Sequence, residues 1–388
     1  KIYNSLGKEI KRPIVTTALS GQAVEKGGFR HFMHKEIHEQ PTMIGNSLNS
    51  FLNSQTREIC LPQLKTDLSK ISRINMVACG TSSFACRIAR YWLEKYAKIP
   101  VSVDIGSEYR YRPLLPSKDE LALFVSQSGE TRDTMASLEI AKENGINTMG
   151  LINVAESSIA RNSDDILTTM AGPEIGVAST KAFTTQLITL AALTIELARL
   201  RNTISKEEEL NLSNSLLELP AAIASILSEE ESIKQIAMVI QDSKDVLYIG
   251  RGTSHGVALE GALKLKEISY LHAEAYAAGE LKHGPIALID EGVPIIGIVP
   301  TDELFDKTLS NLEEAASRGG TIIAITDNKA PNTIDRIVKH RITLPFISVL
   351  AQPILYTIPV QLIAYHTAVI KGTDVDQPRN LAKSVTVE

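Results

Sequence analysis

The segment Ser126-Gln127-Ser128-Gly129-Glu130-Thr131 has the composition and the position of an anion-binding turn. It follows the apolar run Leu121–Val125, which predicts a strand, and precedes Asp133–Asn144, which predicts a helix closed by Gly145. Free N–H groups and the positive dipole end at a helix start favour an anion, and the hydroxyls add donors. Because the turn lacks the lysine of a Walker-type nucleotide site, it predicts a compact phosphate monoester as ligand. The alternative is an ordinary helix cap.

A second hydroxyl-rich turn, Gly80-Thr81-Ser82-Ser83, follows the strand-like run Ile74–Cys79. The helix expected after it places apolar residues such as Ala85, Ile88 and Trp92 along one stripe. In an open parallel sheet, ligands bind at the carboxyl ends of the strands. The two turns therefore predict a single site at that edge.

The chain repeats itself with an offset of about 172–174 residues. Gly80-Thr81-Ser82 recurs as Gly252-Thr253-Ser254, and the strand-like runs recur in the same order. The matching runs are Leu121–Val125 with Ile295–Val299, Thr148–Ile152 with Thr321–Ile325, and Ile166–Thr169 with His340–Thr343. Strands that alternate with helices imply a parallel sheet covered on both faces. The predicted fold class is α/β, with two tandem doubly wound parallel-sheet domains and a C-terminal tail.

Four parts are expected along the chain: an N-terminal linker segment 1–40, a first domain 41–204, a second domain 205–371 and a tail 372–388. Ser205 and Glu208 predict a capping box where the second domain begins. The two copies differ at their turns, because Pro300-Thr301-Asp302-Glu303 stands where the first copy carries hydroxyls. Its carboxylates would repel an anion, so phosphate binding is assigned to the first copy, and other chemistry to the second.

Composition restricts the class of protein. The chain has 388 residues, of which 44% are hydrophobic and 22% charged, with a net charge of −5. These values predict a globular protein with neither a nucleic-acid partner nor an anionic-membrane partner. Three cysteines without a CxxC spacing favour a reducing cytoplasm.

The segment between Arg341 and Lys371 contains no other charged residue and requires a membrane check. Pro345, Pro353 and Pro359 interrupt it. The prediction here is two buried helices separated by proline breaks, and no membrane span.

Glu260, Lys264 and Glu267 fall on one stripe of the helix predicted around Ala258–Tyr270. A carboxylate beside an ammonium in a partly apolar cleft can transfer protons. The alternative is a solvated ion-pair face.

Histidines and a terminal lysine complete the set of candidates. His283 lies in a turn before Gly284-Pro285, and the histidine side chain as a type suits proton transfer at a sugar ring oxygen. On composition alone, Lys383 is a solvated lysine near a terminus. His31, His34 and His38 share a helix face and could share a metal, but without a second metal-type motif a solvated face is expected, and no metal is predicted.

Several long motifs together resemble glutamine–fructose-6-phosphate aminotransferases, also called glucosamine-6-phosphate synthases, and specifically their isomerase half. This half is a pair of flavodoxin-like sugar isomerase (SIS) domains. The motifs are Cys79–Ser82, Ser126–Thr131, Glu174–Lys181, Glu280–Pro285 and Asp376–Glu388. The resemblance covers essentially the whole chain.

The resemblance implies a site for fructose 6-phosphate. The phosphate would lie among Ser82, Ser126, Gln127, Ser128 and Thr131, and the sugar would contact Thr81, Val177, Ser179 and Ala382. By the same resemblance, Lys383 forms a Schiff base with the C2 ketone, Glu267 carries a proton between C1 and C2, Lys264 stabilises the intermediate, and His283 opens the ring.

The resemblance also implies partners. His283 would act from the neighbouring subunit of a homodimer, and ammonia would come from a glutaminase domain, which is expected to be absent from this chain. The product would be glucosamine 6-phosphate, an amino-sugar precursor, and without ammonia the chain would interconvert fructose 6-phosphate and glucose 6-phosphate. The family uses no cofactor in this half.

Two functions of other classes stay open at this point. A non-catalytic sugar-phosphate sensor would need the phosphate turns but no proton-transfer residues. A dinucleotide-dependent dehydrogenase is supported only by Gly250-Arg251-Gly252, because His255 stands where the third glycine of that fingerprint belongs.

Overall fold

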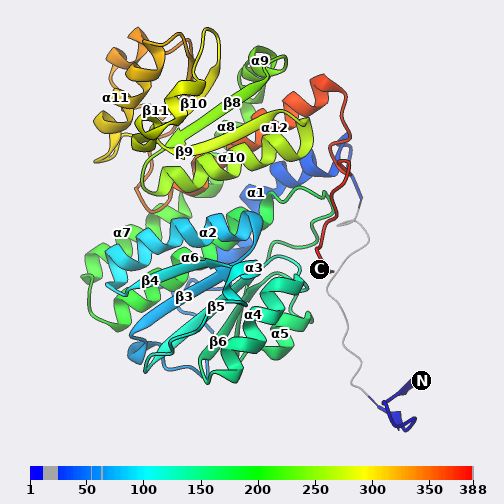
Figure 1. The fold of residues 1–388 in the computed structure, drawn as a ribbon. Helices are drawn as coiled ribbons and strands as arrows, with labels where there is room; N and C mark the ends of the chain where they lie inside the picture. The colour runs from blue at the N-terminus through cyan, green and yellow to red at the C-terminus, as the bar shows by residue number, and fades with distance from the viewer. Residues whose placement is uncertain (12–24, 54, 63, 387–388) are drawn as a thin grey trace.

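A computed structural model describes residues 1–11, 25–53, 55–62 and 64–386. The chain opens with a small antiparallel hairpin, β1 Ile2–Tyr3 and β2 Glu9–Ile10, and continues into helix α1 Phe32–Asn49. The two larger sheets lie at opposite ends of the remaining body, with long helices between them (Figure 1).

The first sheet belongs to the first half of the chain. Its strands are β3 Arg73–Ala78, β4 Val101–Ile105, β5 Glu120–Ser126, β6 Asn147–Ile152 and β7 Asp165–Thr168. They are all parallel, in the order β4-β3-β5-β6-β7. The helical elements of this half are η2 Leu68–Lys70, α2 Gly80–Trp92, η3 Leu93–Ala97, α3 Gly106–Tyr109, α4 Arg132–Glu143, α5 Ser158–Asn162 and α6 Lys181–Leu200. The predicted α/β class and parallel sheet are confirmed.

The second sheet repeats the first. Its strands are β8 Asp245–Gly250, β9 His272–Ala277, β10 Pro294–Ile298, β11 Thr321–Asp327 and β12 His340–Leu344. They are parallel, in the order β12-β11-β10-β8-β9, which is the order of the first sheet read from the other edge. The helical elements are α7 Lys206–Leu217, α8 Leu219–Ser228, α9 Glu230–Ile240, α10 Thr253–Ser269, η4 Ala278–His283, η5 Pro285–Leu288, α11 Phe305–Ala316, η6 Asn332–Arg336 and α12 Gln352–Lys371. The duplication seen in the sequence is therefore a duplication of topology.

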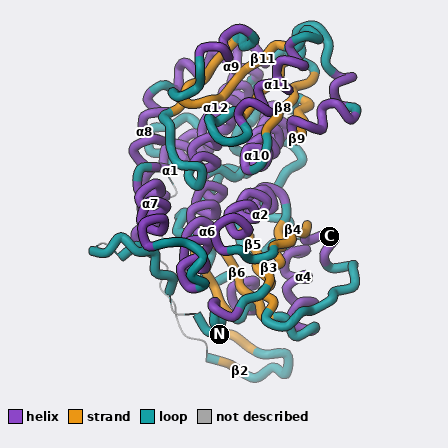
Figure 2. The backbone as a smooth tube through the Cα atoms, turned by 90° about the vertical axis from the view of Figure 1, so that its left-hand side faces the viewer, coloured by secondary structure: helices purple, strands orange, loops and turns teal. Residues whose placement is uncertain are grey.

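The two halves share one hydrophobic core. α10 packs against α2 and α12, and α6 packs against α1 and α2 (Figure 2). Buried side chains of both halves belong to a single apolar cluster. The approach of α10 to α2 is close, because a Cβ on Gly256 would lie 2.4 Å from Cγ1 of Ile88. The start of α2 also lies beside α10, because Thr81 contacts Glu260 of the predicted acid–base stripe.

The prediction of two helices in 341–371 is wrong, because α12 is one continuous helix. Pro353 sits in its first turn, where no intrahelical N–H is needed, and Pro359 lies in its interior. Pro359 cannot donate to the carbonyl of Leu355, but the side chains from Gln352 to Ala368 are all buried. Tertiary packing outweighs the lost hydrogen bond.

Among the residues that the structure describes, three helical segments are long and apolar enough to cross a membrane when judged by length and composition alone: Lys181–Leu200, Lys206–Ser228 and Gln352–Lys371. In the first and the last, 89% of the apolar window is buried inside the protein, against 39% in the middle one. The apolar faces of α6 and α12 are thus used by the core.

The predicted cap at the start of α7 is present, since the Glu208 N–H donates to Ser205 Oγ at 3.1 Å. The predicted boundary between residues 40 and 41 falls inside α1, which contacts α6, α8 and α12. After α12 the tail runs back to the first half, where the N–H of Val177 donates to the carbonyl of Asp376 and the N–H of Arg132 to the carbonyl of Val385.

Candidate active site

A cavity of about 260 Å³ lies where the first sheet, α10 and the C-terminal tail meet. Its lining contains every predicted site residue except His283: Thr81, Ser82, Ser126, Gln127, Ser128, Thr131, Val177, Ser179, Lys264, Glu267, Ala382 and Lys383. Residues that are hundreds of positions apart in the sequence therefore face one space.

The first hydroxyl turn opens α2. Gly80, the first residue of α2, adopts φ +51°, and the equivalent Gly252, just before α10, adopts φ +55°, so a glycine with positive φ stands at the start of both helices. Thr81 Oγ1 donates to Glu260 Oε2 at 2.9 Å, and Ser82 Oγ accepts from Gln186 Nε2 at 3.0 Å. The Ser82 oxygen keeps its own proton available for a ligand.

The second hydroxyl turn lies between β5 and α4. Ser126 Oγ is 3.2 Å from Thr131 Oγ1 and accepts the Gly129 N–H at 3.0 Å. Gly129 has φ +65°, and a Cβ there would lie 1.9 Å from Ser157 Oγ, so only glycine fits. The turn brings hydroxyls and helix N–H groups together at one edge, which is the arrangement that favours a phosphate.

The corresponding turn of the second half is occupied by carboxylates. Asp327 accepts from the N–H of Thr301 and from its hydroxyl, both at 2.7 Å, and Asp302 accepts from the Leu304 N–H. Burial raises the pKa of Asp302. Negative groups thus stand where the first half offers donors.

Lys383 is anchored on the first half by a buried carboxylate. Its Nζ donates to Glu174 Oε2 at 2.6 Å and to the carbonyl of Gly176 at 2.8 Å. Glu174 also accepts from the Ser179 hydroxyl and from the N–H groups of Thr180 and Ala182. Burial opposes ionisation of Glu174, but Lys383 and these donors outweigh it and lower its pKa. The interpretation of Lys383 as a solvated terminal lysine is wrong.

A second glutamate, Glu36 of α1, supports the same loop. Its Oε1 accepts from the N–H groups of Ile175 and Gly176. Burial, and then the charge of Glu174, raise the pKa of Glu36 to about 8. Near neutral pH Glu36 therefore keeps its proton, and Glu174 carries the charge that faces Lys383. Sequence reasoning assigned neither glutamate a role, since no local pattern marks a carboxyl that folds against a distant loop.

The acid–base stripe on α10 is buried instead of solvated. Lys264 Nζ lies 2.6 Å from Glu267 Oε2 and 3.6 Å from Glu260 Oε1, and the side chains of Lys264 and Glu260 are 1% and 0% exposed. Burial raises the pKa of Glu260 to about 8, against the opposing effect of Lys264. For Lys264, burial works against the charge, but the two carboxylates outweigh it and raise its pKa. Glu267, 21% exposed, and Lys264 both line the cavity, so the Glu267 carboxylate reaches it with a cationic partner 2.6 Å away.

His283 does not join these residues in the single chain. It is the last residue of η4 and is exposed, outside the lining of the cavity.

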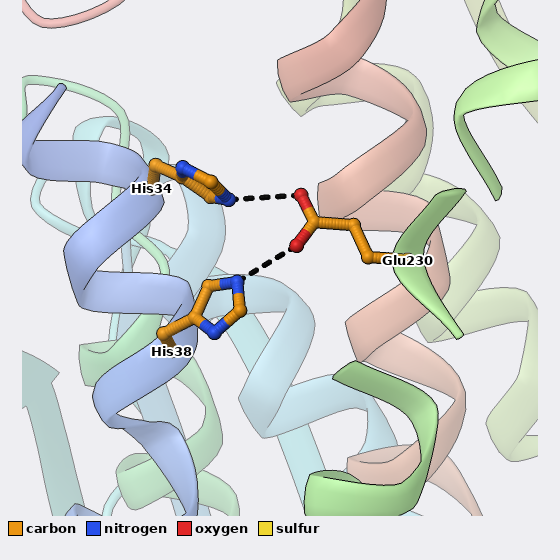
Figure 3. Close-up of side chains that lie close together, drawn as sticks. All are labelled: His34, His38 and Glu230. Carbon is orange, nitrogen blue, oxygen red and sulfur yellow. Dashed lines mark hydrogen bonds and ion pairs between the residues drawn. The ribbon is translucent and has the colours of Figure 1, made fainter. Parts of the chain in front are cut away.

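The expectation of a solvated face for His34 and His38 is also wrong. Both side chains turn toward Glu230, the first residue of α9, with Nε2–O distances of 2.8 Å (Figure 3). His31 turns away from that carboxylate, and its Nδ1 lies 3.1 Å from the hydroxyl of Tyr365.

The SIS domain family model matches residues 67–196 and 239–371, one segment for each sheet. The chain belongs to the SIS domain family. Each of its two SIS domains contains one five-stranded parallel sheet flanked by helices.

The relatives described next share the same name. The chain is 52% identical over 390 residues to the glutamine–fructose-6-phosphate aminotransferase (isomerizing) of Bradyrhizobium diazoefficiens, and 52% identical over 388 residues to that of Zymomonas mobilis. In both cases the match covers 100% of this chain but 64% of the relative's length. The C-terminal domain of the Francisella tularensis glucosamine-fructose-6-phosphate aminotransferase superposes with a TM-score of 0.87 and 44% identity, covering 91% of this chain and 100% of that structure.

Proposed function

We propose that this chain is the sugar-isomerising part of a glutamine–fructose-6-phosphate aminotransferase. The observation that carries the proposal is the joint presence of Lys383, Glu267 and two hydroxyl turns around one cavity. A sensor would need the turns alone. The proposal is supported by similarity along the whole of this chain to proteins with that name, of whose length the chain spans 64%.

In the proposed complex, the phosphate of fructose 6-phosphate occupies the edge formed by Ser82, Ser126, Gln127, Ser128 and Thr131. Hydroxyls and helix N–H groups supply donors there, without the long cationic side chains that would also attract nucleotides. The sugar then extends past Thr81, Val177, Ser179 and Ala382 toward α10 and the tail. Both ends of the substrate are thereby fixed before chemistry begins.

Lys383 acts as the nucleophile. Its amine must first lose a proton, and Glu174, 2.6 Å away, is the group placed to take it. The free amine adds to C2 of the open-chain ketose, and loss of water leaves a Schiff base. Ammonia then displaces the lysine and yields the fructosimine. His283, delivered by a second subunit of a homodimer, opens the sugar ring by a proton transfer at the ring oxygen.

Glu267 completes the isomerisation. It removes a proton from C1 and returns one to C2, while the imine nitrogen gains a proton and the C1 hydroxyl loses one, so that the imine at C2 becomes an amine and C1 becomes an aldehyde, giving glucosamine 6-phosphate. Lys264 stabilises the negative charge that develops on the enediol-like intermediate. In the whole protein the ammonia would come from a glutaminase domain, and the reaction would take place in the cytoplasm. Without ammonia, the same proton transfer would interconvert fructose 6-phosphate and glucose 6-phosphate.

Borohydride trapping tests the proposal. The chain is incubated with fructose 6-phosphate, reduced, and mapped by peptide mass spectrometry. A hexitol phosphate adduct on Lys383 is expected, and none in Lys383→Arg, which keeps the charge beside Glu174. An adduct confined to another lysine would overturn the Schiff-base assignment. Tight sugar-phosphate binding without adduct and without turnover would favour the sensor.

A further inference from the structure

Three of the eight histidines in the chain converge on one carboxylate, and none of them lines the candidate cavity. His34 Nε2 lies 2.8 Å from one oxygen of Glu230 and His38 Nε2 lies 2.8 Å from the other (Figure 3). His366 Nε2 approaches the first of these oxygens at 2.7 Å. One ligand atom from each of His34, His38 and Glu230 lies within 4.8 Å of the others.

The backbone fixes these groups from three separate elements. His34 and His38 stand one helical turn apart on α1, Glu230 begins α9, and His366 lies on α12. Figure 3 shows the two imidazoles of α1 pointing across to the glutamate. A pair of histidines at i and i+4 presents two nitrogens to the same point, which is how helices hold transition metals.

Aromatic rings restrict the imidazoles further. His34 stacks on Tyr365 with a centroid distance of 4.5 Å, and Phe29 lies 5.2 Å from both His34 and His38. The side chains of His34, His38 and Glu230 are 21%, 26% and 18% exposed, so the cluster is enclosed but reachable from solvent. Because these contacts already restrict the imidazole rings, the rings lose little conformational entropy when they bind an ion.

We propose that His34, His38 and Glu230 form a binding site for a divalent zinc ion, with His366 beside the same glutamate. Imidazole nitrogens with one carboxylate select zinc and its neighbours in the first row over magnesium or calcium, which prefer oxygen ligands. Zn–N and Zn–O bonds of about 2.0–2.2 Å separate tetrahedral ligand atoms by roughly 3.3 Å. The contacts of 2.7–2.8 Å must therefore open by about half an ångström when the ion enters.

The bound ion would have a structural role. It joins α1 to α9 and α12, while the other face of α1 carries Glu36, which holds the loop beside Lys383. The ion would thus fix the helix on which the cavity wall rests. This inference does not depend on the sugar-phosphate reaction, and its test reads metal binding directly.

Titration of the metal-stripped chain with Co²⁺ and Zn²⁺ tests the site. We expect one equivalent of Co²⁺ to give the visible absorption of a four-coordinate ion, and one equivalent of Zn²⁺ to displace it and raise the melting temperature. A wild-type chain that binds no stoichiometric ion would overturn the proposal, and the cluster would then be a hydrogen-bonded histidine–glutamate group only.

Variants locate the ion. His34→Gln with His38→Gln should weaken Zn²⁺ binding by about 100-fold or more, because even a change of a supporting partner costs 10–100-fold. His272→Gln is the matched control, since His272 is exposed and also contacts carboxylates, with Asp245 at 2.6 Å. Loss in the control, or none in the double variant, would contradict the assignment. If the double variant fails to fold, His38→Gln alone and the spectrum of the wild-type chain decide the question.

Discussion

The Nζ of Lys383 lies 2.6 Å from Oε2 of Glu174, a carboxylate with no exposed side-chain surface. The last turns of the chain are thereby tied to the loop between β7 and α6, across more than half the sequence. In this contact the proposed nucleophile, Lys383, lies next to the carboxylate that can accept its proton, Glu174. The tail therefore belongs to the cavity wall in the free protein.

Glu174→Gln should slow the formation of the reducible adduct on Lys383 by about 10–100-fold, because the amide cannot take the ammonium proton. Binding of fructose 6-phosphate should change far less, since Glu174 lies behind the lysine. Single-turnover trapping and equilibrium binding separate the two effects. Glu156→Gln, an exposed glutamate, is the control. Equal losses of binding and trapping would show that Glu174 has only a structural role.

Glu36→Gln should stabilise the protein increasingly as pH rises from 5 to 8. In the folded chain Glu36 keeps its proton up to about pH 8, whereas the unfolded chain releases it near the ordinary value of 4.5. Wild-type stability is therefore lost progressively between these values, at up to about 1.4 kcal/mol per pH unit, for a total on the order of a few kcal/mol. Denaturant unfolding at pH 5, 6.5 and 8 measures it. A difference between variant and wild type that does not change with pH would contradict the prediction.

Gly129→Ala should destabilise the protein by about 2–4 kcal/mol and weaken fructose 6-phosphate binding, because left-handed strain is added to a clash with Ser157. Gly145→Ala is the matched control, since Gly145 has φ +72° with open space around its Cβ position. It should cost only about 1 kcal/mol and leave binding intact. Urea unfolding and calorimetric binding provide both readouts. Equal effects of the two substitutions would argue against a tightly built phosphate turn.

Mixing His283→Gln with Lys383→Ala should restore activity that neither variant has alone. If His283 acts in the neighbouring subunit, a mixed dimer contains one site with both native residues, and an equal mixture recovers roughly one quarter of wild-type isomerisation. The assay is conversion of fructose 6-phosphate to glucose 6-phosphate after refolding the variants together. A mixture as inactive as its components would place His283 in the same chain as Lys383.

The sequence predicted correctly those elements that are specified by patterns within a few neighbouring residues. The strands ending in hydroxyl turns, the helix after Thr131 and the Ser205 cap all appear as expected, because turn chemistry and apolar runs act over a few residues. β4 and β9 were not predicted. Each strand lies at the edge of its sheet and has both buried and exposed side chains, so neither sequence is a continuous apolar run.

Long-range contacts explain the remaining differences. The prolines in 341–371 led to the prediction of two helices, but burial on all sides keeps α12 continuous through Pro359. The histidines of α1 looked solvated because their partner, Glu230, is almost 200 residues away. Lys383 was identified only by the resemblance to a family, because no residue near it in the sequence indicates a contact with Glu174.

A crystal structure with fructose 6-phosphate tests the central claim most directly. We predict phosphate density bounded by Ser82, Ser128 and Thr131, with C2 of the sugar directed at Lys383 and C1 at Glu267. Hexose density beside Pro300–Glu303 of the second SIS domain, with nothing bound at Ser128, would contradict the account.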